Sequence, residues 1–113
     1  MTENMAVPRA EIVPLLDEFK SELRKLYGSR LCEIILYGSW ARNEANSDSD
    51  IDIAVVLKGE VRPGVEIGRM IDVITELNLK YGVLLAVYPV SEQDYQTLKS
   101  PLLLNLRREG VPA

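Results

Sequence analysis

The chain contains no histidine and a single cysteine, Cys32, among its 113 residues. Without histidine, the catalytic triads that pair serine or cysteine with histidine are excluded, as is a zinc site with histidine ligands. A lone cysteine excludes an intramolecular disulfide and a cysteine metal cluster. Because apolar residues surround Cys32, we interpret it as a structural thiol in a buried strand.

The chain also lacks a positive charge excess and long apolar runs. Its net charge is -4, which gives no electrostatic footprint for nucleic acid and argues against a DNA- or RNA-coating role. The longest apolar runs fall far short of the ~20 residues that span a bilayer, and no signal-peptide pattern follows Met1. We therefore expect a cytoplasmic protein with no membrane association. Its length predicts one domain over 1–113, with 1–7 as a flexible N-terminus.

Apolar residues recur at steps of three and four in two long stretches, which predicts two amphipathic helices. The first begins near Pro8 and ends at Gly28, and the second follows Pro63-Gly64 and ends near Gly82. Shorter helices are expected at 38–44, after an N-cap at Ser91, and at 101–109. The residues that mark the inner face of the first helix are Ile12, Leu16, Phe19, Leu23 and Leu26; those of the second are Ile67, Met70, Ile71, Ile74 and Leu77.

Three strands are expected between these helices, at 31–37, 51–57 and 83–90. The order helix, strand, short helix, strand, helix, strand, helix predicts an α+β fold with α/β layering. Its core is a small mixed β-sheet of at least three strands flanked by helices. The sequence does not fix the relative direction of the first two strands. A surplus of leucines at 102–106 fits either the domain's own core or an interface with a partner or a second subunit.

One motif carries chemistry: Gly38-Ser39, then ten residues, then Asp50-Ile51-Asp52 at the start of a strand. Alternate strand residues share a face, so Asp50 and Asp52 lie ~6–7 Å apart and can converge on one ion or bridge two. Magnesium suits them because it takes oxygen ligands and shares them with phosphates. The Gly38-Ser39 turn at a helix start favours a phosphate. Arg42, one turn later, can meet a phosphate oxygen or a carboxylate.

Each part of this motif alone is commonly structural. A glycine-serine pair is usually a turn, an Asp-x-Asp at a strand entrance is usually solvated or capping, and an arginine such as Arg42 is usually a surface residue. Their joint occurrence at this spacing favours metal-bound nucleotide chemistry. Tyr37 and Trp40 beside the turn can stack on a base, although core or rim packing explains them more simply.

At these residues the chain resembles the minimal nucleotidyltransferases of the DNA polymerase beta-like superfamily, whose signature is Gly-Ser, ten residues and Asp-x-Asp. The neighbouring residues and the segment 100–110 also resemble the family. The resemblance implies the nucleotidyltransferase fold and transfer of a nucleoside monophosphate from an NTP, most simply ATP. Asp50 and Asp52 would hold Mg²⁺ or Mn²⁺ as catalytic residues, with the phosphates near Gly38, Ser39 and Arg42.

The resemblance also implies a biological setting. Minimal nucleotidyltransferases often pair with a small helical HEPN protein as toxin–antitoxin modules, so an antitoxin that nucleotidylates its partner is one expectation. A protein or small-molecule acceptor fits this setting better than a polynucleotide. A homo-oligomer is also compatible with the sequence.

One feature departs from the superfamily, which normally supplies a third carboxylate from the next core strand. Here the strand at 83–90 contains no acid, and Ala86 stands at the expected place. The other acids weighed for this role are Glu60, Glu66, Asp72, Glu76, Glu92 and Asp94. Three hypotheses therefore stay open: an active nucleotidyltransferase, a catalytically impaired nucleotide- or partner-binding module on the same fold, and a plain interaction domain.

Overall fold

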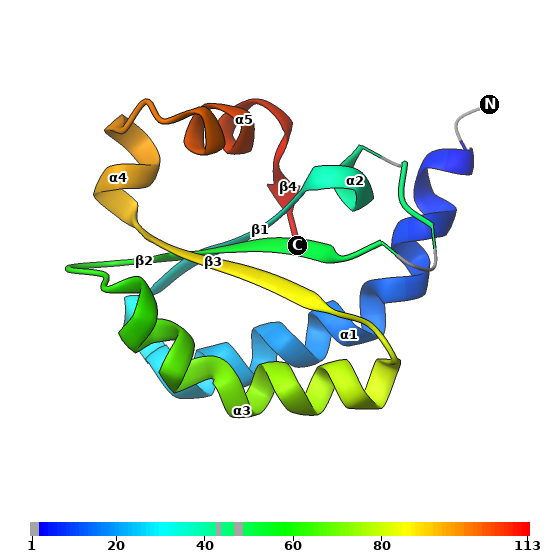
Figure 1. The fold of residues 1–113 in the computed structure, drawn as a ribbon, viewed down its shortest axis with the longest axis horizontal. Helices are drawn as coiled ribbons and strands as arrows, with labels where there is room; N and C mark the ends of the chain where they lie inside the picture. The colour runs from blue at the N-terminus through cyan, green and yellow to red at the C-terminus, as the bar shows by residue number, and fades with distance from the viewer. Residues whose placement is uncertain (1–2, 43, 47–48) are drawn as a thin grey trace.

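The structure is a computed structural model that describes residues 3–42, 44–46 and 49–113. Ten elements follow one another along these residues (Figure 1): α1 (Glu3–Tyr27), the 3₁₀ turn η1 (Gly28–Arg30), β1 (Leu31–Tyr37), α2 (Gly38–Ala41), β2 (Ile51–Leu57), α3 (Pro63–Tyr81), β3 (Leu85–Ser91), α4 (Glu92–Thr97), α5 (Pro101–Glu109) and β4 (Val111–Pro112).

The four described strands form one mixed sheet in the order β3-β2-β1-β4. β1 runs antiparallel to both β2 and β4, whereas β2 and β3 are parallel. Helices α1 and α3 cover one face of the sheet, and α4 and α5 lie over the other (Figure 1). The predicted layered α+β fold with a small mixed sheet is confirmed, and the structure supplies the strand directions that the sequence left open.

β2 is buried on both faces because it lies between β1 and β3 and has helices above and below. Ile51, Ile53 and Val55 face α1 and α3, while Ala54 and Val56 face α5. This arrangement explains why the strand is a nearly continuous apolar run rather than an alternating one. Asp52 falls on the α5 side, since alternate residues of a strand share a face.

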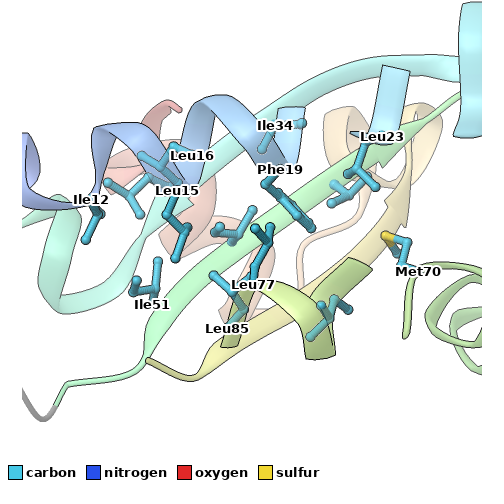
Figure 2. Close-up of a cluster of buried hydrophobic side chains, with 14 of the residues drawn as sticks. Ile12, Leu15, Leu16, Phe19, Leu23, Ile34, Ile51, Met70, Leu77 and Leu85 are labelled. Carbon is cyan, nitrogen blue, oxygen red and sulfur yellow. The ribbon is translucent and has the colours of Figure 1, made fainter. Parts of the chain in front are cut away.

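The larger core lies between the sheet and the helices α1 and α3 (Figure 2). Phe19 and Leu23 of α1 are fully buried beside Ile34 of β1, and Leu77 of α3 belongs to the same cluster. The smaller core joins Leu103 and Leu106 of α5 to the other face. The leucine surplus at 102–106 therefore serves the domain's own core in part, although Leu104 is 47% exposed.

Several boundaries differ from the sequence prediction. α1 begins at Glu3 rather than near Pro8, while Met1 and Thr2 of the expected flexible segment 1–7 lie outside the described residues. Pro63 opens α3 rather than ending the preceding loop, because proline fits the first helical turn. The predictions that Leu26 and Ile71 face the core are wrong, since both are more than 40% exposed.

The fourth strand was missed. β4 has two residues, and it exists because Val111 and Pro112 pair with Leu36 and Ile35 of β1. Such a short strand depends on its partner rather than on local propensity. Among the described residues, no helix has the length and apolar character needed to cross a membrane.

Candidate functional site

Asp50 and Asp52 lie where the chain enters β2, on the sheet face that α5 covers. Asp52 pairs across the sheet with Tyr37 of β1 on one side and with Ala86 of β3 on the other. Asp50 is exposed and Asp52 is half-buried. The two carboxylates therefore stand at the open end of the central strand, next to the turn that follows β1.

Gly38 opens that turn and lies against Asp52. Its φ of 72° is in the left-handed region that favours glycine, and a Cβ added there would collide with the Asp52 carboxylate. The glycine thus leaves room for the carboxylate itself. The motif's two halves, separated by ten residues in the sequence, are in direct contact in the fold.

The surroundings of Asp52 disfavour its ionised form, chiefly through burial. Burial raises the pKa of the Asp52 carboxyl, and the neighbouring Asp50 raises it further, while Arg42 lowers it. Burial, together with the charge of Asp52, also raises the pKa of the Tyr37 hydroxyl to about 12, so the phenol stays protonated at neutral pH. A divalent cation at Asp50 and Asp52 would relieve the repulsion between them.

Arg42 is engaged by two carboxylates in this structure. Its Nε donates to Glu44 Oε1 at 2.9 Å, and its Nη1 donates to Glu109 Oε1 at 3.3 Å. These ion pairs raise the pKa of Arg42. From the sequence we expect Arg42 to contact a phosphate or a carboxylate, and the structure shows the carboxylate contacts. The contact with Glu109 was missed because Glu109 lies 67 residues after Arg42, and nothing in the local sequence indicates that the two meet.

The rest of the turn forms the short helix α2, in which Trp40 is 4% exposed and belongs to the large core. Its indole Nε1 donates to the Ser49 backbone oxygen at 3.5 Å. The packing alternative is confirmed for Trp40, which cannot stack on a base from this position. Ser39 lies half-buried at the start of the turn, and its backbone oxygen accepts from Glu44 N at 2.9 Å.

No third carboxylate joins Asp50 and Asp52 in the part of the chain that the structure describes, where no group of three metal-ligating side chains occurs. Ala86 occupies the neighbouring position on β3, ~4.8 Å from Asp52 in a sheet of ordinary spacing. Its methyl group offers no ligand. The strand register places Ala86 beside Asp52, and the expectation that this is the position of the third ligand stays a prediction.

The six acids that the sequence analysis weighed as a third ligand lie away from Asp52. Glu66, Asp72 and Glu76 belong to α3, which covers the opposite face of the sheet. Glu66 is 3% exposed and accepts a hydrogen bond of 2.8 Å from the Tyr27 hydroxyl. Glu60, Glu92 and Asp94 follow the far ends of β2 and β3, roughly 16 Å or more along the strands from Asp52.

The contact between Gly38 and Asp52 predicts the effect of Gly38→Ala. The added methyl group would meet the carboxylate and impose a strained φ, so the free energy of unfolding is expected to fall by about 2 kcal/mol. Thermal and urea unfolding measure this loss. Gly59→Ala is the matched control, since Gly59 has a similar positive φ but open space around it. An equal loss in both variants would contradict a specific role for the carboxylate contact.

A small mixed sheet with a glycine-serine turn packed against the Asp52 carboxylate, and with Asp50 two residues before it, is consistent with a nucleotidyltransferase domain. The chain belongs to the nucleotidyltransferase domain family, which it matches over residues 16–100. Members of this family generally use divalent metal ions, and the domain implies a nucleoside triphosphate as substrate.

Named relatives support this assignment. A Methanocaldococcus jannaschii protein named "Putative protein adenylyltransferase" is 40% identical over 78 residues, which cover 69% of this chain and 72% of the relative. A second protein of that organism with the same description is 28% identical over 101 residues, covering 89% and 97%. The protein adenylyltransferase MntA of Thermococcus cleftensis is 37% identical over 83 residues, covering 65% and 82%.

Proposed function

We propose that this chain transfers AMP from ATP to a hydroxyl group of a protein, with a divalent cation held by Asp50 and Asp52. The observation that carries the proposal is the pair of mutually repelling carboxylates Asp50 and Asp52, of which Asp52 packs against Gly38 and has a raised pKa. The names of the relatives support adenylyl transfer and a protein acceptor.

The residues fit one cation. Asp50 and Asp52 provide hard oxygen ligands, their repulsion would fall when a cation binds, and the exposed Asp50 leaves the site open to a nucleotide. Mg²⁺ or Mn²⁺ would supply charge stabilisation to the phosphates. Gly38 and Ser39 would lie beside the phosphates, with Arg42 as a further donor.

The reaction is an in-line displacement at the α-phosphorus. The acceptor oxygen forms a bond to phosphorus, the bond to the bridging oxygen breaks, and pyrophosphate leaves with that electron pair. The acceptor's proton passes to solvent water. Tyr37 does not serve as a base, because its pKa of about 12 keeps it protonated.

Incubation with ATP labelled at the α-phosphate and a candidate acceptor tests the proposal. Label should enter the acceptor protein when Mg²⁺ or Mn²⁺ is present, and label at the γ-phosphate should not. Incorporation that persists when both Asp50 and Asp52 are replaced by asparagine would contradict the assigned site.

A second function is favoured by Ala86, which lies beside Asp52 on β3 and offers no carboxylate where we expect the third ligand. A chain with two carboxylates can hold a metal–nucleotide complex and neutralise a partner by occlusion, without transfer. Binding of MgATP with no label transfer to any acceptor would favour this binding module over the enzyme.

The acceptor that we propose is a helical HEPN-type partner, with this chain as the antitoxin of the pair. This step rests on the resemblance of the motif and on the relatives' description as protein adenylyltransferases. Co-expression with the protein encoded by the neighbouring gene tests it. A partner that stays toxic and unmodified in the presence of this chain would contradict the antitoxin role.

A further inference from the structure

The contact between Arg42 and Glu109 joins the turn of the functional site to the end of α5. Arg42 follows α2 directly, and its charge acts on Asp52. Glu109 is the last residue of α5, and its side chain is 32% exposed. The contact therefore brings a carboxylate from a distant segment to the mouth of the site.

The backbone that carries Glu109 is held in place by packing and strand pairing. Gly110 packs so closely that an added Cβ would meet Ile35 and the Leu106 backbone, and Gly110 N donates to Leu106 O at 2.8 Å. β4 follows at once and pairs with β1. Because this backbone is fixed by packing and pairing, holding Glu109 near Arg42 costs little additional conformational entropy.

Glu44 contacts the same guanidinium differently. It lies two residues after Arg42, and its side chain is 63% exposed, so this pair is local and solvated. Together the two carboxylates accept hydrogen bonds from the Nε and Nη1 donors of Arg42. A guanidinium offers the same donors to a carboxylate and to a phosphate. A nucleotide phosphate at the Gly38-Ser39 turn would thus compete with these carboxylates for Arg42.

We propose that Glu109 is an autoinhibitory carboxylate that occupies Arg42 in place of a nucleotide phosphate and must release it when a nucleoside triphosphate binds. This inference rests on the proposed nucleotide site. It makes the affinity for nucleotide depend on a residue of α5 that does not itself bind nucleotide. Any partner that draws Glu109 away from Arg42 would raise nucleotide affinity.

Calorimetric titration with MgATP tests the proposal in a double-mutant cycle. Glu109→Gln keeps the shape of the side chain and removes its charge, so MgATP should bind about threefold to tenfold more tightly than to the unmodified protein. In the Arg42→Ala background the same change should alter affinity by less than about twofold. Glu76→Gln on α3 is the matched control, because it makes the same charge change on the opposite face of the sheet.

Each outcome decides the question. Tightening that appears only when Arg42 is present supports the autoinhibitory contact. Equal tightening in both backgrounds would mean general charge repulsion, and no tightening would mean a structural ion pair; either result overturns the proposal while the nucleotide site stands. If neither the unmodified protein nor Glu109→Gln binds MgATP, the proposed function falls and this proposal falls with it. Thermal unfolding confirms that each variant is folded.

Discussion

Asp52→Asn is expected to reduce AMP transfer on the order of a thousandfold. Asp52 is the proposed metal ligand that packs against Gly38, and the charge stabilisation that a bound metal supplies is worth several kcal/mol, with each ~1.4 kcal/mol a factor of ten in rate. Asparagine keeps the shape of the side chain and removes its negative charge. Label transfer from α-labelled ATP at saturating Mg²⁺ measures the loss.

The same variant should be more stable than the unmodified protein when metal is absent. The pKa of Asp52 is raised in the folded state, so the unfolded chain gives up this proton at a lower pH than the folded protein does. The free energy of unfolding therefore falls as pH rises from the ordinary pKa of aspartate to the raised folded value. At neutral pH, Asp52→Asn removes this penalty and should raise Tm by about a few degrees.

These two effects separate function from folding. The gain in Tm should shrink as the pH falls below the ordinary pKa of aspartate, where Asp52 is protonated in both states. Added Mg²⁺ should stabilise the unmodified protein and have less effect on the variant. A variant that lost both transfer and stability at neutral pH would indicate a structural role for Asp52, contrary to our account.

Ala86→Asp is expected to create a second ion site. Ala86 lies beside Asp52 in the parallel register of β3 and β2, so the new carboxylate would join the existing pair. The affinity for a second Mn²⁺ should rise by about tenfold or more, because ligand charge tunes such affinities over orders of magnitude. Calorimetry and electron paramagnetic resonance count the bound ions.

Ala86→Asn is the control, because it adds a side chain of the same shape without the charge. It should leave the ion count unchanged. Without metal, Ala86→Asp should be less stable than Ala86→Asn, since three carboxylates would then repel one another. If the aspartate variant gains no ion affinity over the asparagine variant, Ala86 does not occupy the third ligand position.

The long helices and the three main strands can be predicted from the local sequence, whereas the start of α1 and the short strand β4 cannot. Strong periodicity and caps locate α3, whose C-terminal Gly82 adopts a φ of 66° as the helix stop requires. β4 and the early start of α1 carry no such signal. β4 forms because Val111 pairs with Leu36 of β1. This is a tertiary contact, so residue spacing along the chain does not predict it.

For the candidate site, too, some features could be predicted from the sequence and others could not. The spacing from Gly38 to Asp52 predicted where the acidic pair lies. The strand register places Ala86 beside Asp52, while its role as the third ligand position stays a prediction. The physical reason for Gly38 was missed, since only the fold shows the Asp52 carboxylate against it. The contact between Arg42 and Glu109 was also beyond prediction, because it joins an exposed residue to a half-buried one from a distant segment.

Calorimetric titration with ATP, with and without Mg²⁺, tests the central claim most directly. If Asp50, Asp52 and the Gly38 turn hold a metal–nucleotide complex, ATP should bind the unmodified protein with one site per chain and should need Mg²⁺ to do so. Asp52→Asn should abolish that binding while leaving the protein folded. No binding under either condition, or binding that ignores both Mg²⁺ and the loss of the Asp52 charge, would contradict the account.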